Sequence, residues 1–141
     1  LMIMDTDSID VAVMAPEKIK PGDNNANSIV IQIDYESTVF LFTGDAKYSP
    51  QDFPTNKTAV LKVSHHGSRH NTDITDITAI DPEFAVISVG KNNRYKHPDQ
   101  ETLDILSAAG AEILRTDIEG TIVFSTDGVN ISVGKYPDIP R

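Results

Sequence analysis

The sequence of 141 residues contains no cysteine. Disulfides, thiolate metal ligands and a cysteine nucleophile are therefore excluded within the chain. This absence leaves the compartment open, because a chain without thiols tolerates oxidising and reducing surroundings alike. Long apolar runs are also absent: none approaches the roughly 18 residues of a membrane span, and no basic-then-apolar stretch marks a secretory signal. We expect no membrane segment in this chain.

Positive charge is scarce. Lys and Arg number 12 and Asp and Glu number 21, which gives a formal net charge of -9 at pH 7. A chain this acidic does not attract nucleic acid through a general electrostatic field. A phosphate-bearing substrate would need local help, and bound metal cations are the natural source of it.

The rest of the composition is that of an ordinary globular protein. Hydrophobic residues make up 39% and charged residues 23%, which excludes low-complexity and disordered classes. We expect a single domain, residues 1–141, that buries roughly 68–70% of its unfolded surface. The chain opens with Leu1-Met2-Ile3-Met4, in the middle of an apolar pattern, so we expect a piece of a longer protein.

Turn residues divide the chain into short apolar runs, which are typical of strands. Eight strands are expected, at residues 9–14, 28–34, 38–42, 59–63, 84–89, 112–115, 120–125 and 129–133. The second and third strands form a hairpin, and so do the last two, across an Asp-Gly turn. A polar loop is expected over residues 17–27.

Two helices are expected. Residues 72–80 form a short helix with Asn71 or Thr72 as N-cap, and residues 98–109 form a longer one that stops at Gly110. Strand pairs followed by alternation of strand and helix favour an α/β (α+β) fold. Its mixed sheet is covered by helices on one face, and the other face needs a partner layer.

Three of the four histidines lie within six residues, just after the strand 59–63: His65, His66 and His70. Active sites of α/β proteins form at such strand ends, and neutral imidazole is the commonest metal ligand. Gly67 allows the chain to bend sharply after the first pair. Turn residues with satisfied hydrogen bonds are an equally good interpretation of the same pattern.

Thr43-Gly44-Asp45 ends the preceding strand. A carboxylate at that place could bridge two cations. Asp45 could instead cap a helical turn that begins at Ala46, and this segment alone favours capping. Ser68 does not lie in a G-x-S-x-G elbow, which argues against a serine nucleophile.

Two further segments are polar. Residues 24–28 can donate and accept hydrogen bonds at a site, although such a run is more often a turn. Residues 92–98 follow a buried strand and precede a helix. Arg94 and Lys96 could hold a phosphate there, and His97 could donate a proton or bind a metal. An ordinary polar loop is an equally good interpretation of this segment.

Together the segments form an ordered set that is more specific than any one of them. It consists of Asn24-Asn25 with Ser28, Phe42-Thr43-Gly44-Asp45-Ala46, Leu61-Lys62-Val63-Ser64-His65-His66-Gly67-Ser68, Ile87-Ser88-Val89-Gly90-Lys91-Asn92-Asn93-Arg94-Tyr95 with His97-Pro98, and Arg115-Thr116-Asp117 with Gly120-Thr121-Ile122. The set resembles the C-terminal part of the metallo-β-lactamase-like domain of ComEC-type competence (DNA-uptake) proteins and their stand-alone relatives. The resemblance covers about residues 9–134.

The resemblance implies one half of an αββα sandwich built from two similar ββα halves. It implies a metal-dependent phosphodiesterase or nuclease with zinc or manganese in the groove between the halves. In that family pattern Asp45 matches a bridging carboxylate, and His65 or His66 matches the last histidine ligand, with His65 favoured. His97 joins Asp45 and His65 as a candidate for catalysis. Five residues are expected to contact substrate: Asn25, Ser28, Ser68, Asn93 and Arg94.

One departure from the family bears on activity. The first metal-binding motif of the family, H-x-H-x-D-H, does not occur, and no histidine precedes His65. Residues 1–14 resemble the end of the half that carries this motif, or the seam after it. A catalytic zinc site usually takes three protein ligands, so the isolated chain is expected to bind metal weakly and not to cut DNA. A smaller departure is Lys96, which replaces the usual small residue before His-Pro.

The expected partners are the missing N-terminal half of the same domain or a second copy of the chain, and DNA is the expected substrate of the parent protein. The family suggests a location outside the cytoplasm, membrane-attached or secreted. Two other functions stay open: a degenerate, non-catalytic interaction domain, and a hydrolase of small esters or lactones with the same fold. The presence of H-x-H-x-D-H upstream in the parent gene would favour the metal-dependent hydrolase over the non-catalytic domain.

Overall fold

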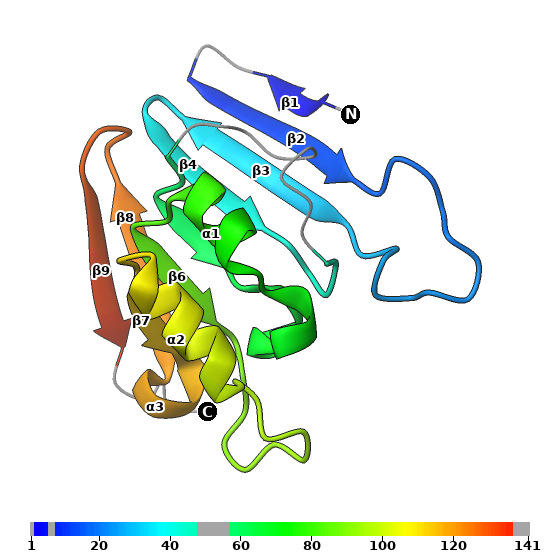
Figure 1. Ribbon diagram of the computed structural model, residues 1–141. Helices are drawn as coiled ribbons and strands as arrows, with labels where there is room; N and C mark the ends of the chain where they lie inside the picture. The colour runs from blue at the N-terminus through cyan, green and yellow to red at the C-terminus, as the bar shows by residue number, and fades with distance from the viewer. Residues whose placement is uncertain (1, 6–7, 48–56, 137–141) are drawn as a thin grey trace.

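The computed structural model describes residues 2–5, 8–47 and 57–136. Seven strands form one sheet whose spatial order follows the chain, and two more form a separate hairpin (Figure 1). The strands are β1 (Met2–Asp5), β2 (Ile9–Ala15), β3 (Val30–Tyr35), β4 (Thr38–Phe42), β5 (Val60–Lys62), β6 (Phe84–Ile87), β7 (Glu112–Arg115), β8 (Thr121–Thr126) and β9 (Ile131–Tyr136). The helices are α1 (Ile74–Ile80), α2 (Gln100–Ala108) and the single turn α3 (Thr116–Glu119), with two 3-10 turns, η2 (Ser64–Gly67) and η3 (Arg69–Asn71).

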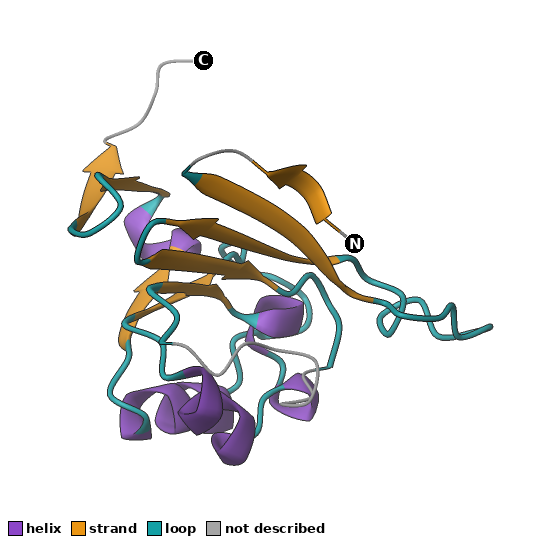
Figure 2. Ribbon diagram, turned by 90° about the horizontal axis from the view of Figure 1, so that it is seen from above, coloured by secondary structure: helices purple, strands orange, loops and turns teal. Residues whose placement is uncertain are grey.

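The seven-stranded sheet changes from antiparallel to parallel at β4. Strands β1 to β4 pair antiparallel, whereas β4 to β7 pair parallel. Parallel neighbours need a crossover connection, and α1 connects β5 to β6 while α2 connects β6 to β7. Both helices lie on the same face of the sheet (Figures 1 and 2). The carboxyl ends of β4, β5 and β6 therefore meet at one edge.

The face covered by helices carries the larger core. Leu41, Leu61 and Ala85 lie side by side on β4, β5 and β6 and are at most 1% exposed. Ile77 of α1 and Leu106 of α2 belong to the same buried cluster. Burying one such aliphatic side chain stabilises a fold by about 1.5–3 kcal/mol, so this layer holds the parallel half of the sheet together.

The β8–β9 hairpin packs on the opposite face. Its inward side chains are Ile122, Phe124, Ile131 and Val133, and they contact a cluster formed by Val60, Phe84 and Leu114. The ring centroids of Phe84 and Phe124 are 5.3 Å apart at an interplanar angle of 64°. This edge-to-face geometry is favourable for two aromatic rings.

The same face continues over β2, β3 and β4 as an apolar strip. Residues paired across a sheet point to the same side. Phe40 packs on the hairpin cluster, so its partner Ile33 and the next partner Val11 belong to this face. Phe42 and its partner Ile31 continue the strip, and Phe42 is 42% exposed. This part of the face is therefore left partly open.

The predicted mixed sheet with helices on one face is confirmed. The eight expected strands correspond to β2–β9, with ends shifted by up to three residues, and β1 lies outside the expected set. The helical turn α3 is likewise additional. The sequence pattern also predicts a tail at residues 136–141; Tyr136 instead ends β9, and residues 137–141 lie outside the described residues.

The predicted N-cap of the first helix is wrong. Asp73 caps α1, and its carboxylate accepts a hydrogen bond from the Thr75 N–H at 2.8 Å. The side chain of Asn71 is engaged elsewhere, at the site described below. The second helix begins at Gln100 rather than Pro98, and the Asp99 carboxylate accepts from the Arg69 N–H instead of capping it.

Across residues 2–5, 8–47 and 57–136, no helix has both the length and the apolar character needed to cross a membrane.

Replacing Phe124 by alanine tests the packing of the hairpin. The substitution removes the edge-to-face contact with Phe84, and we expect unfolding free energy to fall by about 2–4 kcal/mol. Urea unfolding followed by circular dichroism measures the change. Val129→Ala is the control, because Val129 lies in the turn of the same hairpin and is 74% exposed. Equal losses in both variants would mean that the hairpin does not pack on the sheet.

Candidate functional site

Three loops meet at the carboxyl edge of the parallel strands. β4 leads into Thr43-Gly44-Asp45, β5 leads into η2, and β6 leads into residues 88–97. The Thr43 hydroxyl donates to the Lys62 carbonyl at 2.7 Å, which joins the ends of β4 and β5. The His65 N–H donates to the Gly44 carbonyl at 3.1 Å. These bonds fix the first two loops relative to each other.

The adjacent residues His65 and His66 point in different directions. Both have left-handed backbone conformations, with φ angles of 46° and 57°, which are uncommon for residues that carry a Cβ. Gly67 follows with φ of 84°. A Cβ on Gly67 would lie 2.6 Å from the Cβ of Pro98. The close approach requires glycine and joins η2 to the segment that carries His97.

His66 faces Asp45. Its Nε2 lies 3.7 Å from Oδ1 of the carboxylate, and both side chains are partly exposed. On the other side of the ring, Nδ1 lies 2.7 Å from the Ser88 carbonyl oxygen. A carbonyl only accepts, so Nδ1 carries the hydrogen and, in the neutral ring, Nε2 presents its lone pair toward Asp45. Metal-binding histidines are usually held in this way.

His65 lies beside two asparagines rather than beside the carboxylate. Its Nδ1 is 3.2 Å from Asn71 Oδ1 and 3.5 Å from Asn25 Nδ2. The amide of Asn71 also donates to the backbone carbonyl of Asp45 at 3.0 Å. The ring centroid of His65 is 6.2 Å from that of His66 and 5.9 Å from that of His97. All three histidines thus gather at one edge, and it is His66 that faces Asp45.

The loop before α2 is organised around Asn93. Its side chain accepts from the His97 N–H at 2.9 Å and donates to the His97 carbonyl at 2.8 Å. The ring of Tyr95 stacks on that of His97, with centroids 6.0 Å apart and an interplanar angle of 17°. The guanidinium of Arg94 lies 4.6 Å from the centroid of the Tyr95 ring. In the structure Asn93 therefore holds the loop, and Arg94 packs on its neighbour.

The two serines expected to contact substrate lie within the framework of the site. Ser28 Oγ accepts from the Asp45 N–H at 3.2 Å, and a Cβ on Gly44 would lie 2.9 Å from the Ser28 Cβ. Ser68 is 3% exposed, and its N–H donates to the His65 carbonyl at 3.0 Å. Both serines fix the backbone of a candidate ligand. No helical turn begins at Ala46 or Lys47, so the capping interpretation of Asp45 is not supported by the described residues.

A lysine lies near the carboxylate on the side of the open sheet face. Burial lowers the pKa of Lys62, and the charge of Asp45 opposes that shift. The Lys62 ammonium donates to the Val63 carbonyl at 2.8 Å. Together with Phe40, Phe42 and Phe124 this lysine lines an open hollow of about 380 Å³ between the apolar strip and the hairpin. The carboxylate thus lies close to the face that the hairpin leaves partly open.

A second hollow of about 300 Å³ adjoins His66. Its lining includes His66, Ser88, Tyr95 and His97. Within the described ranges, no three His, Cys, Asp or Glu side chains are grouped so that they could hold a metal ion. His70 is exposed on η3 and does not line this hollow. Three contributors were not expected from sequence: Asn71, Tyr95 and the Ser88 carbonyl. A backbone carbonyl has no sequence signal, and only the proximity of Tyr95 to His97 in the chain could have indicated its place.

Comparison with known proteins shows similarity to parts of much longer chains. The chain is 38% identical over 117 residues to ComE operon protein 3 of Bacillus subtilis, a match covering 79% of this chain and 15% of that protein. It is 32% identical over 124 residues to Competence protein ComA of Neisseria gonorrhoeae, covering 84% of this chain and 18% of that protein. These similarities support a relationship to competence proteins.

Recombination protein 2 of Haemophilus influenzae is also similar, with 27% identity over 113 residues, 78% of this chain and 14% of that protein. The chain thus spans less than a fifth of the length of the curated relatives it matches. No protein-family model matches the chain.

Gly67→Ala tests the close approach of η2 to Pro98. Gly110→Ala is a matched control, because Gly110 has the same φ of 84° but a Cβ added there would meet nothing within 4 Å. In both variants the left-handed backbone strain of alanine lowers the free energy of unfolding by roughly 1–2 kcal/mol. Gly67→Ala should lower it by about 1–3 kcal/mol more, because the new Cβ clashes with Pro98. Thermal unfolding of both proteins measures the difference. Equal melting temperatures would contradict the packing of Gly67 on Pro98.

The end of β6 is held by the turn after β7. The Thr116 hydroxyl accepts from the Val89 N–H at 2.8 Å and donates to the Val89 carbonyl at 2.9 Å. Arg115 and Asp117 form a two-bond ion pair on either side of it, at 3.0 and 2.7 Å. The hydrogen bond from Arg115 lowers the pKa of Asp117 below its ordinary value of 3.8. This turn supports the start of the loop that carries His97.

Asp117→Asn should therefore show a pH-dependent loss of stability. Because the folded pKa of Asp117 is lowered, the ion pair stabilises the fold fully above pH 3.8, and this stability disappears as the pH falls through the folded pKa. We expect a loss of about 1–2 kcal/mol at neutral pH. Urea unfolding at pH 7 and at successively lower pH values measures it. If the difference in unfolding free energy between the unaltered protein and Asp117→Asn stays constant into strong acid, the ion pair does not stabilise the fold as described.

Proposed function

We propose that this chain is the C-terminal part of a metallo-β-lactamase-like domain that hydrolyses phosphodiester bonds of DNA with the help of zinc or manganese. The observation that carries the proposal is the meeting of Asp45 and His66 at the carboxyl ends of β4 and β5, with His66 held through Nδ1 by a backbone carbonyl. The similarity to competence proteins supports DNA uptake as the setting. On this proposal the domain meets DNA outside the cytoplasm.

Asp45 and His66 fit the geometry of two ligands of such a metal centre. Two donors bound to one zinc ion at 2.0–2.1 Å in a tetrahedron lie roughly 3.4 Å apart. The observed 3.7 Å between His66 Nε2 and Asp45 Oδ1 is close to this value. We therefore assign the histidine ligand to His66 and give His65 a supporting place beside it. When bound, the metal would lower the pKa of a water molecule and so supply a nucleophile at neutral pH.

The chain's own residues position and hold groups around that centre. Because a carboxylate has two oxygens, Asp45 would be able to hold a second cation besides the one shared with His66. The ring of His65, which contacts Asn71, has its centroid 6.2 Å from that of His66. His97, whose backbone is held by Asn93, lines the same hollow as His66. We propose proton transfer for one of these two rings.

The remaining ligands are proposed to come from an N-terminal half of the same domain. Two protein donors are fewer than the three of a usual catalytic zinc site. The apolar strip on β2–β4 is the surface against which such a half would pack, and Lys62 lies at its border within reach of the charge of Asp45. A second copy of the chain is the alternative cover.

The small donor set also favours a second candidate, a non-catalytic interaction domain. In that case Asp45 and His66 form a polar pair with a structural role, and the apolar strip binds a partner domain without assembling a reactive centre. Metal binding separates the two candidates, because the interaction domain has no need of it.

Digestion of single-stranded DNA with added manganese tests the proposed function. The chain alone should bind the metal weakly and leave DNA intact. A protein in which a half carrying H-x-H-x-D-H precedes this chain should cut DNA, and either Asp45→Ala or His66→Ala should lower that rate by about 100-fold or more, since a metal ligand is lost.

His70→Ala is the matched control for these variants, because His70 is an exposed histidine outside the site. Its rate should stay within twofold of the unaltered protein. Cleavage that survives loss of both Asp45 and His66 would overturn the proposed centre. So would cleavage by the isolated chain, because the centre would then be assembled from other residues.

A further inference from the structure

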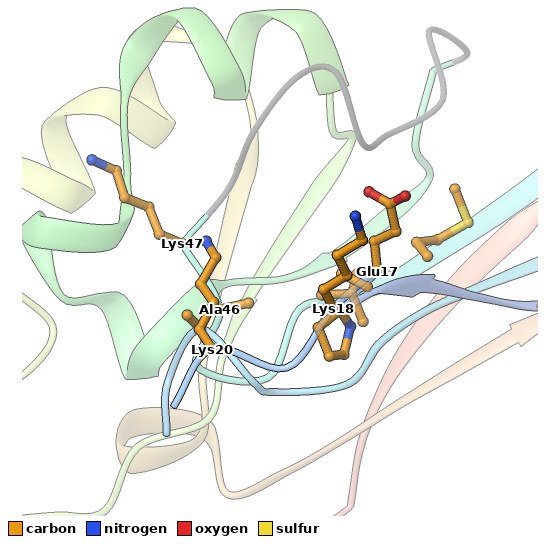
Figure 3. Close-up of a pocket in the computed structure, with 10 residues that line it drawn as sticks. Glu17, Lys18, Lys20, Ala46 and Lys47 are labelled. Carbon is orange, nitrogen blue, oxygen red and sulfur yellow. The ribbon is translucent and has the colours of Figure 1, made fainter. Parts of the chain in front are cut away.

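A lysine-lined cavity lies beside the candidate centre. It has a volume of about 350 Å³ and opens between the end of β2, the loop of residues 16–29 and the end of β4. Buried side chains form part of its lining: Val30 is 0% and Ala46 6% exposed. Lys18, Lys20 and Lys47 also line it (Figure 3).

The charge of this cavity is opposite to that of the molecule. Three of the 12 basic residues line it together with one acidic residue, Glu17, in a chain whose net charge is -9. None of the three lysines forms an ion pair within 4.0 Å in the part of the chain that the structure describes. Burial raises the pKa of Asp76, and the charge of Lys47 opposes that shift. Lys18 and Lys20 are therefore the two lysines offered to an anionic ligand.

The loop that carries two of the lysines is folded on itself. The Lys20 N–H donates to Asn27 Oδ1 at 2.7 Å, and Asn27 Nδ2 donates back to the Lys20 carbonyl at 2.9 Å. The Ala26 N–H donates to the Asp23 carboxylate at 2.9 Å. These bonds hold the backbone of Lys20 in place at the rim of the cavity, which reduces the entropy lost when its side chain binds a ligand.

The segments that line the cavity also carry residues of the candidate centre. Asn25, on the same loop, contacts the ring of His65. Ala46 and Lys47, which line the cavity, directly follow Asp45 in the chain. The cavity lining therefore begins at the residue after Asp45 in the chain.

We propose that this cavity binds a backbone phosphate of a DNA strand next to the phosphate that would be bound at the proposed metal centre of Asp45 and His66. Lysine is a compact point charge that binds phosphate without demanding a fixed geometry, which suits a strand of any sequence. Such a subsite supplies the local positive charge that an acidic protein needs to hold a polyanion. The inference rests on the proposed function, because it takes its ligand from it.

Titration of the isotopically labelled chain with a thymidine tetranucleotide tests this subsite by NMR. EDTA and low salt exclude any bound metal, so the result does not depend on cleavage. We expect the amide signals of residues 18–27 and 46–47 to shift. The double variant Lys18→Gln with Lys20→Gln should bind the tetranucleotide about tenfold more weakly. The slope of the logarithm of its binding constant against the logarithm of salt concentration should fall in magnitude by roughly 1.4, at about 0.7 for each phosphate charge that the variant no longer neutralises.

Lys57→Glu is the matched control. It changes the net charge by the same two units, and Lys57 lies before β5, at the opposite edge of the sheet. Its affinity should stay within twofold of the unaltered chain. Equal weakening in both variants, shifts confined to other residues, or no binding by the unaltered chain would overturn the inference.

Inorganic phosphate forms a separate arm of the experiment. Displacement of the tetranucleotide by an equal concentration of phosphate would reduce the cavity to a simple anion site and overturn the strand assignment. The experiments distinguish failure of the subsite from failure of the proposed nuclease activity. If the tetranucleotide binds through the lysines but the longer protein does not cut DNA, the proposed subsite is supported and the proposed nuclease activity is refuted. If the longer protein cuts DNA but tetranucleotide binding does not depend on Lys18 and Lys20, the proposed nuclease activity is supported and the proposed subsite is refuted.

Discussion

The contact of Gly67 with Pro98 determines how the rest of the site is arranged. It brings η2 against the segment before α2, so that loops from β5 and β6 share one edge. The left-handed conformations of His65 and His66 lead into this contact. Because of them the two rings diverge, one toward the Asp45 carboxylate and the other toward Asn25 and Asn71. A pair of neighbouring residues thereby serves two different environments.

The two faces of the sheet are covered to different extents. Helices α1 and α2 cover one face, where Leu41, Leu61 and Ala85 are almost fully buried. The β8–β9 hairpin covers the other face beside β5–β7, while Phe42 stays 42% exposed on the strip beyond it. The candidate carboxylate lies where this strip begins. A layer that covered the strip would contact the hollow lined by Lys62, whose pKa responds to the charge of Asp45.

The outline of the fold could be predicted because it depends on local patterns. Alternating apolar residues, Asp-Gly at a turn and Gly110 after a helix each act within a few residues of the chain. The N-cap of α1 could not be assigned in this way. Asn71 is a good cap by type, but its amide is used 26 residues away at Asp45, and this long-range bond leaves the capping to Asp73.

The candidate site was predictable in its location and less so in its details. Strand ends placed Asp45 and the histidines together, as the chain pattern indicated. The choice between His65 and His66 depends on two φ angles that no spacing encodes. Ser28 and Asn93 are polar residues in motif segments, yet their side chains hold backbone atoms of Asp45 and His97. Residue type alone does not separate a group that touches a ligand from one that supports it.

The anchor of His66 is a main-chain atom, the carbonyl oxygen of residue 88. Every amino acid provides that oxygen, so the orientation of the ring places no demand on the side chain at this position. The side chain at residue 88 can therefore change without disturbing the imidazole. The backbone at this point must keep its position, which the hydrogen bonds between Val89 and Thr116 maintain. Among related chains, the geometry of this histidine should outlast the identity of the residue that secures it.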